Sequence, residues 1–168
     1  MPLLYDIIDS PIGAIVLAGT DEALSFVGLP ESRQPLVIPP EWVRKPNAFS
    51  RAKRQLAAYF DGELIEFDLP LAAQGTEFQQ RVWKALRTIP YATTISYGEL
   101  ARRIGNPKAS RAVGLANGAN PLSIIVPCHR VIGANGSLTG YGGGLKAKKH
   151  LLDLERRHAP RDPFSLVS

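Results

Sequence analysis

The sequence has little cysteine or histidine and no long apolar run. It contains one cysteine, Cys128, and three histidines, at positions 129, 150 and 158. A single cysteine excludes an intramolecular disulfide, and the histidines lack the spacing of a metal site, so we expect no metal and no cofactor. No apolar run approaches the roughly 20 residues that a membrane-spanning helix needs.

The start of the chain also lacks the pattern of a secretion signal. Its first residues, MPLLYDIIDS, have no basic beginning and include Asp6 and Asp9. A lone thiol without an export signal is typical of a reducing compartment, so we expect a cytoplasmic protein.

Charge is distributed unevenly along the chain. Residues 1–75 contain 6 Lys/Arg and 10 Asp/Glu, a net charge of −4, whereas residues 76–168 contain 14 and 5, a net charge of +9. This asymmetry indicates that the C-terminal half faces a polyanion such as a nucleic acid. The alternative is a solvated basic surface without a partner.

The first 75 residues have the pattern of a small α/β unit with an antiparallel sheet, and no chemistry is evident in it. Turn residues separate three predicted strands and a predicted helix that ends near Asp61-Gly62. The strands are Leu4–Ile8, Ile15–Ala18 and Leu24–Leu29, and the helix is Ser50–Phe60. Five prolines between positions 30 and 46 predict a loop.

A helix-turn-helix is predicted after Gly75. Thr76–Gln79 and Ser96–Glu99 match capping boxes, which open helices that run to about Ile89 and Ile104. A third helix fits Ala109–Asn117, with Gly118 as its stop. The basic residues of the last two helices and their turn are Arg102, Arg103, Lys108 and Arg111. Such a pair indicates DNA binding, although it also serves as a plain structural unit.

Cys128 is the candidate nucleophile. It follows a predicted buried strand, Leu122–Val126, and Pro127, and His129 and Arg130 after it could stabilise a thiolate. A buried, inert cysteine is the alternative. Neighbouring residues on a strand point to opposite faces, so contact between His129 and the thiol needs a water or a bend.

Glu155 lies in a last predicted helix, Lys146–Arg157, whose inner face would hold Leu151, Leu152 and Leu154. Its carboxylate could orient His129, as in other catalytic triads. The spacing alone favours a surface residue that pairs with Arg156 or a lysine.

The C-terminal half resembles the O6-alkylguanine-DNA alkyltransferases. The resemblance extends from about Gly75 to Glu155 and is most specific at the Pro-Cys-His-Arg core. The matching segments are Phe78…Val82-Trp83, Ile95–Ala101, Gly105-Asn-Pro107, Arg111–Gly114, Asn120-Pro121, Ile125–Ile132 and Tyr141–Leu145. The resemblance implies an N-terminal α/β domain, residues 1–75, with a structural role, and a winged-helix-like domain, residues 76–168, for DNA binding and alkyl transfer.

The implied activity is repair of O6-alkylguanine in duplex DNA, with O4-alkylthymine as a further candidate substrate. The second helix of the helix-turn-helix would enter the minor groove and the damaged base would flip out. Arg111 would fill the space left in the stack, and Tyr97 would rotate the nucleotide and donate a proton or hydrogen bond to guanine. The implied DNA contacts are Tyr97, Ala109, Ser110, Arg111, Ala112, Gly114, Asn117 and Arg130. Self-association along DNA is a candidate further interaction.

In the implied chemistry, Cys128 takes the alkyl group once and keeps it. His129 would activate the thiol through a water, Glu155 would orient His129, and Asn120 would brace this network. Tyr97 and the backbone N–H groups near Val131 and Gly142 would stabilise the leaving guanine. The implied substrate pocket comprises Val131, Tyr141, Gly142, Gly143 and Lys148.

Two features separate this chain from some relatives in that family. No Cys or His precedes position 128, so the N-terminal zinc site of some members is not expected. Cys128 also argues against members in which tryptophan replaces the cysteine. Three other functions remain open: a damage sensor without methyl transfer, a winged-helix transcription factor and a multiple-turnover cysteine hydrolase. The small groove residues offer few side chains for reading bases, which disfavours the transcription factor.

Overall fold

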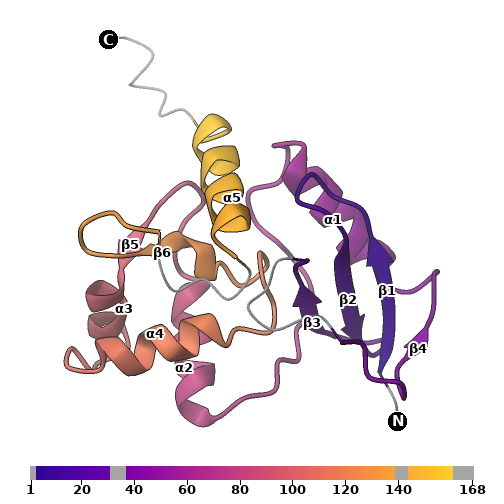
Figure 1. Cartoon of the computed structure of the whole chain (residues 1–168), viewed down its shortest axis with the longest axis horizontal. Helices are drawn as coiled ribbons and strands as arrows, with labels where there is room; N and C mark the ends of the chain where they lie inside the picture. The colour runs from indigo at the N-terminus through magenta and orange to yellow at the C-terminus, as the bar shows by residue number, and fades with distance from the viewer. Residues whose placement is uncertain (1–2, 31–36, 139–143, 161–168) are drawn as a thin grey trace.

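The N-terminal half contains a mixed sheet with a helix packed on it. The structure is a computed structural model that describes residues 3–30, 37–138 and 144–160 (Figure 1). The strands are β1 (Leu4–Ile8), β2 (Ile15–Gly19), β3 (Leu24–Gly28) and β4 (Val43–Arg44), in the order β3-β2-β1-β4. The first three pair antiparallel as predicted.

β4 corrects the prediction of a plain loop and a purely antiparallel sheet. Val43 and Arg44 pair in parallel with Leu4 and Tyr5 of β1. Arg44 also reaches Asp6, whose buried carboxylate accepts from Arg44 Nε at 3.1 Å and Lys53 Nζ at 2.5 Å. These tertiary contacts stabilise an edge strand despite its proline-rich surroundings.

Helix α1 (Ser50–Phe60) lies against the sheet and buries Leu56 and Tyr59 completely (Figure 1). Its bounds match the prediction. The helix ends at Asp61-Gly62, where Gly62 adopts a φ of 77°, a conformation that a side chain would disfavour.

The C-terminal half is mainly helical and contains the predicted helix-turn-helix. Its helices are α2 (Glu77–Leu86), α3 (Tyr97–Arg103), α4 (Ser110–Gly118) and α5 (Leu145–Arg157). Thr76 and Gln79 form the full capping box expected at α2. Ser96 caps α3 as predicted, but the Glu99 carboxylate binds Arg102 and Arg103 instead of completing a second box.

Packing among α2, α3 and α4 fixes the helix pair on the body of the molecule. Val82, Leu86, Leu100 and Val113 are fully buried between them. Trp83 Nε1 of α2 donates to the Ala116 carbonyl of α4 at 2.8 Å, which also fixes their relative position. A short parallel pair, β5 (Ile95–Ser96) with β6 (Val131–Ile132), completes this half.

The two halves meet around the segment that carries the cysteine. Val27 of β3 donates its N–H to the Pro121 carbonyl at 2.8 Å. Helix α5 lies above this junction, between the sheet and the helix pair (Figure 1). Within the described parts of the chain, no helix is both long and apolar enough to cross a membrane.

Candidate active site

The segment that delivers Cys128 is buried, but it is not the predicted strand. Val126 N–H bonds to the Leu122 carbonyl and Ile124 has a φ of 75°, so the chain turns tightly here. Cys128–Arg130 then form a single 3-10 turn, η1. The alternation expected of a strand therefore does not apply to Cys128 and His129, because proline and successive turns interrupt extended backbone.

The Asn120 side-chain amide contacts the Cys128 thiol. Its Nδ2 donates to the Val126 carbonyl at 2.8 Å and lies 3.1 Å from Cys128 Sγ, while its Oδ1 accepts the Leu122 N–H at 3.0 Å. Cys128 itself is 3% exposed. A donor at this distance favours the thiolate over the thiol.

His129, the residue after Cys128, forms a buried pair with Glu155. His129 Nε2 lies 2.6 Å from Glu155 Oε2, and neither side chain is exposed. An ionised carboxylate can only accept, so Nε2 carries the proton and Nδ1 keeps its lone pair. Nδ1 is buried and has no protein partner among the described residues. The carboxylate thus orients His129 as the resemblance implied, and the surface position favoured by spacing is wrong.

Arg130 is the second partner of Glu155, which corrects its prediction as a DNA contact. Its Nε lies 2.8 Å from Oε1 and its Nη2 3.1 Å from Oε2, while Nη1 donates to the Ile89 carbonyl at 2.7 Å. Arg130 is 7% exposed. A buried carboxylate needs such compensation, so this guanidinium is committed to the interior.

The electrostatics keep Glu155 charged and His129 neutral. Burial alone would raise the pKa of Glu155, but hydrogen bonds and charge from His129 and Arg130 hold that pKa well below its ordinary value. Burial lowers the pKa of His129, and the opposing effect of Glu155 is the smaller one. A neutral imidazole next to a thiol can act as a base.

Two further residues bind the carboxylate, one from α1 and one from the segment between α2 and β5, and no local pattern indicates either. The Tyr59 hydroxyl of α1 donates to Oε2 at 2.6 Å, and the Ala92 N–H donates to Oε1 at 3.1 Å. Tyr59 belongs to the helix predicted over Ser50–Phe60, in a unit where the sequence shows no evident chemistry. Its partner lies 96 positions away, so no short-range spacing could have indicated the contact.

Lys148 and Val131 lie together on the inner side of α5. Lys148 is fully buried and its Nζ donates to the Val131 carbonyl at 2.5 Å. Burial lowers the pKa of Lys148 to about 8, against a smaller opposing effect of Cys128. The Val131 N–H itself donates to the Cys128 carbonyl. Tyr141, Gly142 and Gly143 lie outside the described residues.

The outer face of α4 carries small residues, one arginine and one leucine, Leu115, which is 73% exposed. Ser110, Arg111 and Ala112 are exposed, and Ala109 and Gly114 are half-buried. A Cβ on Gly114 would meet nothing closer than Tyr97 Cδ1, at 3.8 Å. Internal packing therefore does not require glycine at this position. Without a side chain, Gly114 leaves the backbone of α4 accessible to a molecule that approaches the helix.

One predicted DNA contact on α4 faces the wrong way. Asn117 is 1% exposed and its Nδ2 lies 3.3 Å from the Cys128 carbonyl, so it supports the active-site turn from below. The prediction failed because Asn117 follows Val113 by one helical turn and so shares its buried face.

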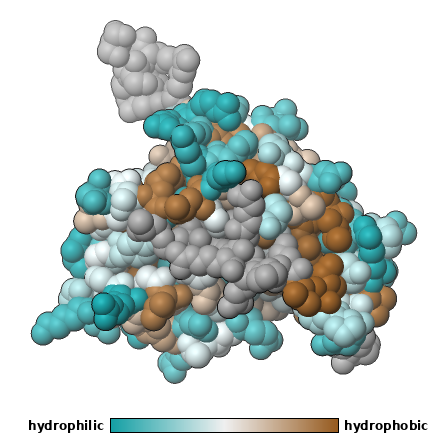
Figure 2. Space-filling model, in the orientation of Figure 1, coloured by the Kyte–Doolittle hydropathy of each residue, from teal (hydrophilic) through white to brown (hydrophobic). Residues whose placement is uncertain are grey.

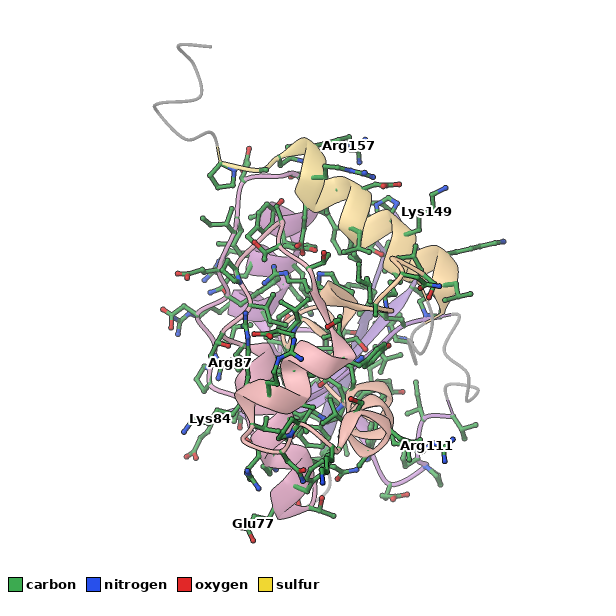
Figure 3. All side chains as sticks on the ribbon, turned by 90° about the vertical axis from the view of Figure 1, so that its left-hand side faces the viewer. Glu77, Lys84, Arg87, Arg111, Lys149 and Arg157 are labelled. Atoms are coloured by element: carbon green, nitrogen blue, oxygen red, sulfur yellow. The ribbon has the colours of Figure 1, made fainter. Side chains whose placement is uncertain are left out.

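Basic residues are spread around the C-terminal half rather than gathered in one patch. The labelled Lys84 and Arg87 lie on the side of the molecule opposite Arg111, and Lys149 and Arg157 lie along α5 (Figure 3). Hydrophilic surface and a small apolar area adjoin where α3 and α4 lie (Figure 2). The positive charge therefore surrounds this half of the molecule and would attract a polyanion from several sides. The distribution of charge alone does not mark out α4 as a binding surface.

Comparison with known proteins accounts for both halves of the chain. Residues 77–157 match the family described as "6-O-methylguanine DNA methyltransferase, DNA binding domain", and residues 3–73 match its "ribonuclease-like domain". A methylated-DNA–protein-cysteine methyltransferase of Methanosarcina acetivorans is 58% identical over 153 residues, covering 91% of this chain and 98% of that protein. One from Mycobacterium tuberculosis is 58% identical over 159 residues, covering 94% and 95%.

Solved structures agree with the sequence matches. A crystal structure of the M. tuberculosis O6-methylguanine methyltransferase has a TM-score of 0.87 at 56% identity and covers 99% of both chains. A second, described as that organism's OGT in complex with DNA, has the same TM-score and covers 98% of this chain and 99% of the other.

Proposed function

Because this chain belongs to the 6-O-methylguanine DNA methyltransferase family, we propose that it repairs O6-alkylguanine in double-stranded DNA by moving the alkyl group to Cys128. The observation that carries the proposal is the position of Cys128 Sγ, 3.1 Å from Asn120 Nδ2 and next in sequence to the buried His129–Glu155 pair. A hydrogen-bond donor to the thiolate and a neutral base that can take its proton are what an activated thiol requires.

The first step prepares the nucleophile. His129 Nδ1 is the ring atom with a free lone pair, since Nε2 is bound to Glu155. It takes the Cys128 proton through a bridging water, and the Asn120 amide stabilises the thiolate that forms. Glu155 stabilises the resulting imidazolium and is itself balanced by Arg130.

The second step is displacement at the alkyl carbon. The thiolate attacks that carbon, an S–C bond forms, and the C–O6 bond breaks with its electron pair going to guanine. Tyr97, at the start of α3, donates a proton or hydrogen bond to the departing base. Lys148, buried near Cys128, adds positive charge to the pocket. The thioether is stable, so each molecule acts once.

DNA reaches the site across α4. Its small outer residues let the helix approach the minor groove closely, and Arg111 takes the place of the flipped nucleotide. Flipping costs a few kcal/mol, less for a badly paired base, which favours the lesion over normal guanine. The proposed partner is therefore duplex DNA with O6-alkylguanine, with O4-alkylthymine and self-association along DNA as finer proposals. The single thiol that must stay reduced fits a cytoplasmic site of action.

A titration tests the single-use mechanism. Protein is mixed with increasing amounts of free O6-benzylguanine and the guanine released is counted. We expect release to stop at one guanine per protein. Continued release would contradict the proposal and favour a cysteine hydrolase, and binding of lesion DNA with no release from any substrate would favour a damage sensor.

A further inference from the structure

The N-terminal half places one side chain in the active site, and the alkyl-transfer mechanism above assigns it no task. Tyr59 of α1 is fully buried, and its hydroxyl donates to Glu155 Oε2 at 2.6 Å. The same oxygen accepts the His129 Nε2 proton, also at 2.6 Å. Arg130 Nη2 lies farther from this oxygen, at 3.1 Å, so Tyr59 and His129 are the two nearer of its three donors.

We propose that Tyr59 is a positioning residue that limits how strongly Glu155 binds His129, and thereby sets the strength of His129 as the base for Cys128. The proposal rests on the alkyl transfer proposed above. The proposal also gives the N-terminal half a part in the chemistry. Tyr59 of α1 would reduce the negative charge that Glu155 of α5 presents to His129.

A neighbouring tyrosine shows that burial beside Glu155 does not by itself produce this contact. The Tyr91 ring lies 6.2 Å from the Tyr59 ring and 5.7 Å from the Arg130 guanidinium. Its hydroxyl is buried and has no hydrogen-bond partner among the described residues. Of two adjacent buried tyrosines, only Tyr59 is aimed at the carboxylate.

The Tyr59 hydroxyl is protonated and can therefore donate its hydrogen bond to Glu155. Burial, and after it the negative charge of Glu155, raise the pKa of Tyr59 far above its ordinary value. The phenol therefore keeps its proton at neutral pH and donates a hydrogen bond to the carboxylate. A hydrogen bond from a buried donor to a charged acceptor is among the stronger ones in proteins, so it changes how the carboxylate interacts with His129.

The direction of the effect follows from the groups that surround His129. Glu155 favours its protonated form, whereas Arg130 and Lys148 disfavour it, and Cys128 adjoins it in sequence. Tyr59 offsets part of the Glu155 charge. Removing the hydroxyl leaves more of that charge for His129, so imidazolium is stabilised and the pKa of His129 rises. The neutral base then exists only at higher pH.

Tyr59→Phe tests this directly, because it removes the hydroxyl and keeps the ring. The measurement is the rate of Cys128 alkylation by free O6-benzylguanine between about pH 5 and pH 9, which avoids any effect on DNA binding. We expect the acid limb of the pH–rate profile to move upward by about half a unit to one unit, with the rate at high pH nearly unchanged. Tyr91→Phe is the matched control, and its profile should match that of the unmodified protein.

An acid limb that stays in place or moves downward in folded Tyr59→Phe would overturn the proposal. Should this variant unfold, 3,5-difluorotyrosine at position 59 provides a second test, because its more acidic phenol is a stronger donor. We then expect the limb to move downward, and an unmoved limb would overturn the proposal. Failure of the unmodified protein to be alkylated would instead contradict the alkyl transfer itself.

Discussion

His129 Nε2 lies 2.6 Å from Glu155 Oε2 in a fully buried pair, and this contact leaves the other ring nitrogen, Nδ1, with a free lone pair. The carboxylate accepts from Tyr59, Ala92, His129 and Arg130, so it joins α1, the segment after α2 and the active-site turn to α5. The pair is thus a structural junction as well as a part of the proposed chemistry.

We expect Glu155→Gln to slow alkyl transfer and to alter its pH dependence. The glutamine amide would oppose the donors of Arg130 and His129, and the guanidinium would remain buried without a counter-charge. Loss of one partner of a buried ion pair destabilises by about 3–5 kcal/mol, which denaturant unfolding can measure. An unchanged pH–rate profile in the folded variant would remove Glu155 from the mechanism.

Stability should fall as pH decreases below about 6.5, because His129 is held neutral in the folded protein. Its pKa is lowered by burial from the ordinary value of 6.5. The unfolded chain therefore binds a proton before the folded one does, and the free energy of unfolding decreases by up to about 1.4 kcal/mol per pH unit. Urea unfolding between about pH 7.5 and pH 5.5 measures this slope.

His129→Gln is the control for this pH dependence. It removes the titrating ring, so the variant should lose most of that slope. The same slope in both proteins would mean that other groups cause it. The lowered pKa of Glu155 adds a second loss of stability at still lower pH, as protonation of the unfolded chain begins near its ordinary value of 4.5.

Asn120→Ala should slow the reaction by raising the pKa of the Cys128 thiol. The variant loses the donor that lies 3.1 Å from Sγ. A hydrogen bond to a charged group contributes about 1.5–3 kcal/mol, so we expect the rate at neutral pH to decrease by about tenfold to a hundredfold. The rate should recover at alkaline pH. A loss that is equal at all pH values would indicate instead that Asn120 only braces the Val126 backbone.

Arg111→Ala should separate binding of DNA from chemistry. If Arg111 takes the place of the flipped base, the variant repairs duplex O6-methylguanine about tenfold or more slowly, since flipping costs a few kcal/mol. Its reaction with free O6-benzylguanine should stay nearly unchanged. Arg87→Ala removes another exposed positive charge, on the opposite side of the molecule, and serves as the control (Figure 3). Equal losses on both substrates would place Arg111 in the pocket or the fold.

Gly114→Ala should make the protein more stable and a poorer repair protein. The added Cβ fits, with its closest contact at 3.8 Å, and alanine in a helix is favoured over glycine by about 1 kcal/mol. The same methyl group would stand between α4 and the proposed minor groove. Thermal unfolding and repair of duplex DNA measure the two effects, and unchanged repair would argue against close approach at this position.

Local signals in the sequence predicted the elements that depend on local contacts. The Thr76–Gln79 capping box and the bounds of α1 were predicted correctly because their hydrogen bonds connect residues a few positions apart. The helix pair followed from the same kind of signal, with one-residue shifts at its ends. β4 was missed because it is supported by pairing and an ion pair with β1, about 40 positions earlier in the chain.

The errors at the site have a common cause in long-range contacts. Arg130 is a basic residue of the type that contacts DNA, yet it is buried because Glu155, 25 positions later, compensates its charge. Cys128 and His129 were expected on a strand, whereas turns bring them into a 3-10 helix. Asn120 and the Cys128–His129–Glu155 set were named through family resemblance, and the geometry alone shows how Tyr59 joins them.

The most direct test of the account is intact mass after the protein is mixed with a short duplex that contains one O6-methylguanine. We expect a single gain of one CH2 group, mapped to Cys128 by peptide analysis and absent from Cys128→Ser. Tight binding to the lesion with no gain in mass would contradict alkyl transfer and make Cys128 a structural residue of a damage sensor.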